Sequence, residues 1–76
     1  MREFYKLIFK NVKLAILGAP YVMKSEIKSE YYEGDFERKW KNLEQNNCIK
    51  RVGFGDEEYY LNLEFYKDLK KEFNML

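Results

Sequence analysis

The chain of 76 residues contains no histidine and only one cysteine, Cys48. Without histidine it lacks the commonest general base and the commonest metal ligand. A single cysteine forms neither an internal disulfide nor a cysteine-based zinc cluster. A glycine-rich loop that could hold a phosphate is missing as well. We therefore expect no catalytic residues, no metal and no cofactor, and we do not expect an enzyme.

The sequence also lacks a long uncharged stretch near its start. The apolar stretch from Phe4 to Leu17 is interrupted by Lys6, Lys10 and Lys13. These charges argue against a secretory signal peptide and against a membrane span. The expectation is a soluble cytoplasmic protein with no membrane partner.

The length predicts one domain over residues 1–76. The net charge is only +1, but residues 1–24 and residues 38–51 each carry five basic side chains and one acidic side chain. The many aromatic residues (six Phe, seven Tyr and one Trp) supply buried area for a small core. A domain of this size still buries only roughly 60% of its unfolded surface, so a partner would stabilise it.

In the first half of the chain, the spacing of charged and apolar residues predicts two helices. Charged side chains recur within one sector of a helix over residues 2–17, and Gly18-Ala19-Pro20 then ends that helix. Residues 22–24 form a short extended link. A second helix, beginning at Lys24 or Ser25, covers residues 25–32.

The third helix is predicted over residues 36–46. Asp35 suits its N-cap, and Phe36, Trp40 and Leu43 form one buried stripe. Asn47 suits a left-handed C-cap, because asparagine tolerates positive φ better than most residues.

A hairpin and a last helix complete the prediction. A strand begins over residues 50–52, a turn covers residues 53–56, and a return strand points Tyr59, Leu61 and Leu63 inward and Tyr60 and Asn62 outward. Helical spacing resumes from Glu64, with Tyr66, Leu69, Phe73 and Leu76 on one side. The expected order is helix, helix, helix, hairpin, helix.

This order and the residues after the third helix resemble the winged helix-turn-helix superfamily, especially MarR-like and related small bacterial, archaeal and viral regulators. Leu43-Glu44 matches a Leu-Glu pair near the end of the family's recognition helix. Asn47-Cys48-Ile49 stands where a Gly-Leu-Ile-like turn is usual, and Lys50-Arg51 begins the wing. The resemblance implies an α+β fold with three helices, a two-stranded β-hairpin wing and a C-terminal helix. The acidic residues 56–58 in the wing depart from the pattern and would repel phosphate.

The resemblance also implies that the third helix enters the major groove of double-stranded DNA. The polar face of that helix carries the groups that pair with base edges, and we expect base reading by Arg38, Lys41, Asn42 and Gln45. Basic and hydroxyl groups nearby are candidates for the DNA phosphates, and they are Lys24, Ser25, Lys28, Lys39, Lys50 and Arg51.

The predicted first helix has more apolar surface than one small domain covers. We expect part of it to join the end of the chain in a homodimer interface formed by Phe4, Tyr5, Phe9, Val12, Ile16 and Phe73. A twofold axis would place the two recognition helices in successive major grooves. The alternative is that these side chains fill the core.

Two function classes stay open. The first is a sequence-specific DNA-binding transcriptional regulator acting as a homodimer. The alternative is a winged-helix protein-interaction module, such as a small viral or plasmid inhibitor of host machinery, that does not bind DNA. The near-neutral charge, the acidic wing and the apolar surface favour this alternative.

Overall fold

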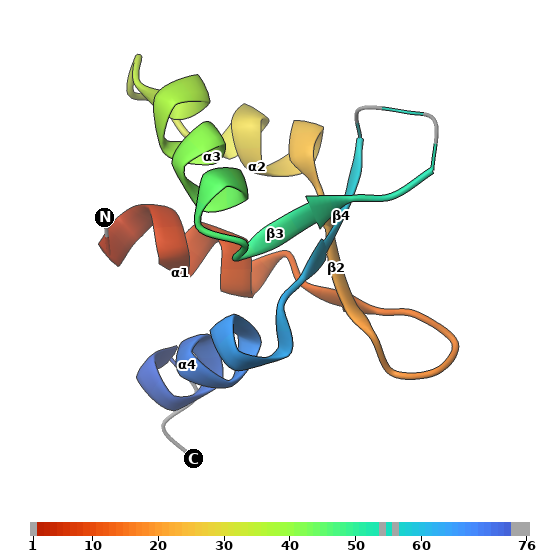
Figure 1. Ribbon diagram of the computed structural model, residues 1–76. Helices are drawn as coiled ribbons and strands as arrows, with labels where there is room; N and C mark the ends of the chain where they lie inside the picture. Colours follow the sequence, from red (N-terminus) through yellow and green to blue (C-terminus); the bar gives the residue numbers. More distant parts are fainter. Residues whose placement is uncertain (1, 54, 56, 74–76) are drawn as a thin grey trace.

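The computed structural model describes residues 2–53, 55 and 57–73. Within these residues the chain is an α+β domain of four helices and one four-stranded antiparallel sheet (Figure 1). In chain order the elements are α1 (Arg2–Lys10), β1 (Lys13–Leu14), β2 (Pro20–Met23), α2 (Lys24–Glu30), α3 (Phe36–Gln45), β3 (Ile49–Arg51), β4 (Glu58–Leu61) and α4 (Leu63–Phe73).

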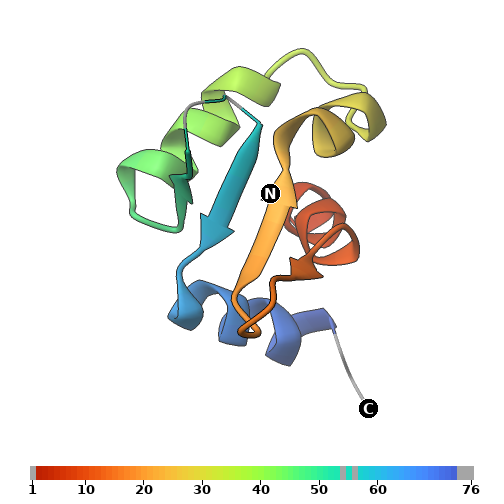
Figure 2. The same cartoon turned by 90° about the vertical axis from the view of Figure 1, so that its right-hand side faces the viewer.

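The sheet has the strand order β1-β2-β4-β3. The strand β2 lies between α1 and α2 in the sequence, and it pairs with β4 through Val22 opposite Tyr59. The strands β3 and β4 form a second hairpin, with Lys50 opposite Tyr60. The helices lie on one side of the sheet, and a view turned by 90° shows them around the central pair β2 and β4 (Figure 2).

The core is centred on aromatic rings. The indole of Trp40 stacks on Phe36 with ring centroids 5.4 Å apart. It also forms edge-to-face contacts with Tyr59 and Phe4, at centroid distances of 5.0 Å and 6.4 Å. The prediction of one buried stripe on α3 is confirmed, because Phe36, Trp40 and Leu43 are all buried. Burial of such large side chains stabilises a small domain efficiently.

The first helix was predicted to reach residue 17, and this is wrong, because α1 ends at Lys10. The side-chain amide of Asn11 donates a hydrogen bond to the Leu7 carbonyl at 2.8 Å. An asparagine side chain that bonds the backbone locally competes with helix continuation. The lysine spacing is helical only up to this point, and Lys13 belongs to a strand.

Residues 13–23 form a β-hairpin that the predicted order of elements omits. Its turn is closed by hydrogen bonds from Ala15 N to Ala19 O and from Gly18 N to Ala15 O, both 2.8 Å. Gly18 has φ +83°, which glycine adopts without strain. The sequence Gly18-Ala19-Pro20 therefore makes a turn between strands, and two strands precede α2.

The left-handed cap predicted at Asn47 is confirmed by its φ of 60°. The Cys48 N–H donates to Leu43 O at 2.9 Å and the Asn47 N–H donates to Glu44 O at 3.1 Å. This pair of bonds is the Schellman arrangement, which satisfies the last carbonyls of α3.

The inward positions predicted for Tyr59 and Leu61 and the outward position of Tyr60 are also confirmed. Leu63 was predicted to point inward, and this is wrong, because it is the first residue of α4 and is exposed. The predicted turn residues Phe54 and Asp56, and Leu76 in the last helix, lie outside the described residues.

Candidate nucleic-acid interface

The outward face of α3 carries the residues predicted to read bases. Because Phe36, Trp40 and Leu43 hold the opposite face in the core, Arg38, Lys41, Asn42 and Gln45 are all exposed. Part of this face borders a shallow hollow of about 420 Å³, lined by Glu37, Trp40, Lys41, Glu44 and Gln45. The helix therefore presents mixed donors and acceptors on one surface.

One carboxylate and one amide contact residues on that surface. Arg38 is held by Asp35, with Nη2 2.8 Å from Oδ2, and this pair is exposed. Asn42 accepts a hydrogen bond from the Asn46 side chain at its Oδ1, 2.7 Å away. Exposed ion pairs of this kind contribute little to stability and exchange readily.

Lys24 and Lys28, two phosphate candidates on α2, converge on one carboxylate of α3. Their Nζ atoms lie 3.1 Å and 2.9 Å from the two carboxylate oxygens of Glu37. Hydrogen bonds from Lys28 and Lys24 lower the pKa of Glu37. Lys24 and Lys28 thus lie next to α3, and Glu37 offsets part of the charge of these two lysines.

Ser25 makes a contact that the sequence does not indicate. Glu57, which precedes β4, accepts hydrogen bonds from the Ser25 hydroxyl and from the Ser25 N–H at 2.9 Å, and the Lys24 N–H donates to the Glu57 carbonyl at 2.8 Å. These bonds from Ser25 lower the pKa of Glu57. A carboxylate therefore binds the hydroxyl of Ser25, which is one of the predicted phosphate contacts.

Lys39 lies largely inside the protein, with a side chain only 13% exposed. Its ammonium donates to the Tyr31 hydroxyl, which in turn donates to Asp35 Oδ1 at 2.6 Å. The bond from Tyr31 and the charge of Lys39 lower the pKa of Asp35, and the bond to Asp35 raises the pKa of Tyr31. Asp35 stands at the N-cap of α3 but makes no side-chain capping bond there. We assign Lys39 to this internal network instead of to a phosphate contact.

Lys50 and Arg51 lie on β3, next to the end of α3. Both side chains are exposed. Both border an open hollow of about 490 Å³ that also includes Asn47, Tyr60 and Asn62. Lys50 is exposed and lies opposite Tyr60.

The residues predicted to form a dimer interface are mostly covered by the chain itself. Phe4 has no exposed surface, so its placement in an interface is wrong. Tyr5 packs against Phe65 with ring centroids 5.7 Å apart, and Phe9 stacks on Phe73 at 6.1 Å. The helix α4 thus covers much of the apolar face of α1, and Val12 is half-buried.

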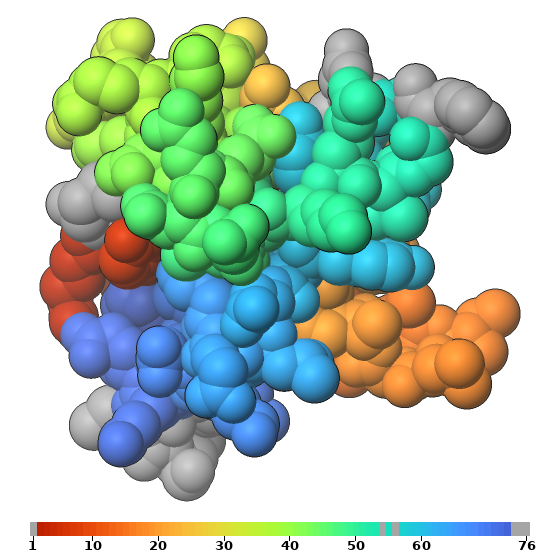
Figure 3. Space-filling view, in the orientation of Figure 1, coloured from red at the N-terminus to blue at the C-terminus, as the bar shows by residue number. Residues whose placement is uncertain are grey.

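Ile16 is the exception, because it lies in the β1–β2 turn and is fully exposed. Neighbouring Leu17 is 96% exposed, and Leu14 is also exposed. In a space-filling view this hairpin protrudes from the body of the protein (Figure 3). Sequence reasoning placed these residues on a helix; only Gly18 and Pro20 gave a local signal for the turn.

Comparison of the chain with protein-family models, with curated proteins and with solved structures found no match. In the described part of the chain, no three cysteine or carboxylate side chains are grouped to hold a metal ion. Nor does any described helix have the length and apolar character needed to cross a membrane.

Proposed function

We propose that this chain is a winged helix-turn-helix protein that binds double-stranded DNA and regulates transcription, with α3 in the major groove. The observation that carries the proposal is the outward face of α3, where Arg38, Lys41, Asn42 and Gln45 are exposed together. Arginine pairs with guanine, and asparagine and glutamine pair with adenine, through two hydrogen bonds each. The succession of α2, α3, the β3–β4 hairpin and α4 supports the same proposal.

The charges around α3 favour a polyanion only moderately. The exposed or half-exposed cations at this face are Lys24, Lys28, Arg38, Lys41 and Lys50, and the carboxylates are Asp35, Glu37 and Glu44. Duplex DNA would compete with Glu37 for the two lysines of α2. Since each neutralised phosphate contributes roughly −0.9 to the slope of log affinity against log salt, we expect a shallow slope of about −3 to −4.

Selection from a random duplex library, followed by fluorescence anisotropy across a salt series, tests this function. The chain should enrich one sequence and bind it more tightly than a scrambled duplex of equal length. Equal binding to both duplexes would leave only nonspecific attraction and would contradict base reading. The variant Lys71→Ala, which removes one exposed charge from α4, is the control for the variants of α3.

A second function is favoured by the exposed side chains of Leu14, Ile16 and Leu17. An apolar tip of this kind is typical of protein contacts, and it supports a protein-interaction module with the same fold. Binding to duplexes at low salt distinguishes the two functions. A protein-interaction module should bind no duplex there, whereas a DNA-binding protein should bind most strongly.

A further inference from the structure

The β1–β2 hairpin ends in an apolar tip that the rest of the chain does not cover. Ten consecutive residues, 14–23, carry no charge, in a chain of which 36% is charged. Within them Ile16 is 100%, Leu17 is 96% and Leu14 is 61% exposed. Isolated exposed apolar side chains are ordinary, but Leu14, Ile16 and Leu17 lie close together on one hairpin and form a contact surface.

An open apolar groove lies between α1 and α4. It has a volume of about 510 Å³, and its apolar walls include Tyr5, Phe65, Leu69 and Phe73. Cys48 and Asp68 also line it, together with Arg2 and Glu72, which form an ion pair with each other. This volume falls in the range of roughly 300–1,000 Å³ in which proteins enclose small ligands. Burial and the charge of Asp68 raise the pKa of the Cys48 thiol, which fits an apolar groove in which Asp68 is the one carboxylate of the lining residues without an ion pair among the described residues.

The tip and the groove also complement each other in charge. Lys13 stands directly before the tip, and its one ion pair among the described residues is with the exposed Glu26. Asp68 makes no ion pair in the described part of the chain. Because an exposed pair is weak and exchanges readily, Lys13 can meet Asp68 of another molecule when the tip enters the groove.

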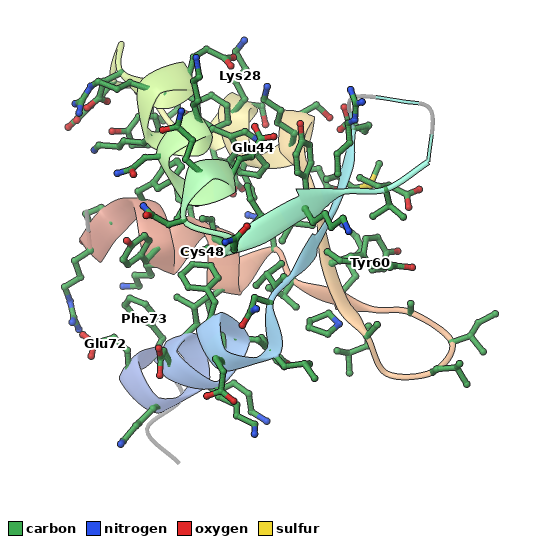
Figure 4. All side chains as sticks on the ribbon, viewed as in Figure 1. Lys28, Glu44, Cys48, Tyr60, Glu72 and Phe73 are labelled. Atoms are coloured by element: carbon green, nitrogen blue, oxygen red, sulfur yellow. The ribbon has the colours of Figure 1, made fainter. Side chains whose placement is uncertain are left out.

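The two surfaces lie at opposite ends of the molecule. The hairpin projects to the right in Figure 1, whereas Cys48, Glu72 and Phe73, which line the groove, lie at the centre and left in Figure 4. A molecule therefore cannot fill its own groove with its own tip. Contacts between unlike surfaces repeat from copy to copy and close into a ring or continue as a chain.

We propose that the apolar tip of one copy of this protein inserts into the α1–α4 groove of a second copy, so that copies associate head to tail. The contact is small compared with stable interfaces, which bury about 800 Å² on each partner, so we expect weak association that depends on concentration. It does not require DNA. On a duplex, if the proposed function holds, it would make binding by neighbouring copies cooperative.

Sedimentation of the full chain without DNA is the first test. The wild type should form dimers and larger species as its concentration rises. The double variant Ile16→Ser with Leu17→Ser should weaken association at least about a hundredfold, because it removes two large apolar side chains from the contact. Thermal unfolding should be unchanged in that variant. A wild type that stays monomeric at every concentration would overturn the proposal.

Disulfide trapping identifies which surfaces meet. One protein carries Ile16→Cys with Cys48→Ser, and thus a thiol only on the tip. The other carries Ile16→Ser with Leu17→Ser, and thus a thiol only in the groove. With diamide as the oxidant, the mixture should give one cross-linked dimer of the two proteins and nothing larger. The matched control, Tyr32→Cys with Cys48→Ser, places the thiol at another exposed position and should give background cross-linking.

The alternative occupants give different results. A cross-link between two copies of the tip protein would indicate a tip-to-tip dimer and would overturn the head-to-tail contact. A monomeric wild type that sediments with phosphatidylcholine vesicles, when the Ile16→Ser, Leu17→Ser variant does not, would assign the tip to lipid. Loss of DNA binding with retained association would refute the proposed function and leave this contact intact.

Discussion

Replacement of Trp40 by alanine should remove most of the stability of the domain. The indole is 1% exposed and contacts the rings of Phe36, Tyr59 and Phe4. Deletion of a buried aromatic side chain costs about 3–5 kcal/mol. A chain of 76 residues has a free energy of unfolding of about 4–11 kcal/mol in total. The variant should therefore be largely unfolded or barely stable.

The variant Trp40→Phe separates the contribution of ring packing to stability from that of the unpaired indole N–H. Among the described residues nothing accepts a hydrogen bond from the buried Trp40 Nε1. Trp40→Phe keeps one ring against Phe36 and Tyr59 and removes this unpaired donor, whose burial costs about 1–3 kcal/mol. The gain offsets part of the lost packing, so Trp40→Phe should cost clearly less than Trp40→Ala.

Urea unfolding followed by far-ultraviolet circular dichroism measures both variants, since Trp40 is the sole tryptophan and its fluorescence is lost. At a slope of about 1 kcal/mol per molar urea, a loss of about 3 kcal/mol moves the midpoint by about 3 M. A Trp40→Ala variant within about 1 kcal/mol of the wild type would refute the reasoning, because α3 would then be held by another face.

Three further predictions concern local contacts. Asn47→Ala should destabilise the domain by about 1 kcal/mol in urea unfolding, because φ is 60° there, whereas Asn47→Gly should be close to neutral; equal effects of both would argue against the left-handed cap. The pKa of Glu57 is lowered in the folded state, so its bonds with Ser25 stabilise the protein above the unfolded-state pKa and are lost as the pH falls through the folded value. Glu57→Gln should therefore lower Tm at pH 7, and the difference from the wild type should shrink as the pH falls through the acidic range; a difference that does not change with pH would contradict the linkage. Tyr31→Phe removes the hydroxyl that lowers the pKa of Asp35, so carboxyl titration by NMR should show that pKa rise; an unchanged value would exclude the bond.

Local patterns predicted α3 and its surroundings well. The spacing of Phe36, Trp40 and Leu43 defines one face of a helix of ten residues, and Asn47 ends it in a conformation that few other residues adopt. Because a helix buries one stripe, the exposed face with Arg38 and Gln45 follows from the same spacing. The exposed positions of the candidate base-reading residues were accessible from sequence for this reason.

The hairpin of residues 13–23 was not predicted, for a physical reason. The apolar residues from Leu14 to Leu17 satisfy a broad helical pattern as easily as a strand and turn, and periodicity does not distinguish such short runs. The decision depends on Asn11, which ends α1, and on pairing of β2 with β4, nearly forty residues later in the chain. Pairing between strands that are far apart in the sequence cannot be predicted from the pattern of a short stretch of residues.

The charge network around α2 was hidden for the same reason. Ser25 and Glu57 are 32 residues apart in the sequence, and the convergence of Lys24 and Lys28 on Glu37 depends on how α2 and α3 cross. Sequence spacing identifies the charged residues, but only the tertiary structure shows which of them neutralise one another. This is why six phosphate candidates could be named and only some remain available to a phosphate.

The most direct test of the central claim compares the wild type with the double variant Arg38→Ala, Gln45→Ala on one selected duplex by fluorescence anisotropy. Loss of two base contacts should weaken specific binding at least about thirtyfold, weaken binding to a scrambled duplex only by the loss of one charge, and leave Tm unchanged. The control Lys71→Ala should behave as the wild type. Equal affinity of wild type and double variant for the selected duplex would contradict the claim that α3 reads DNA.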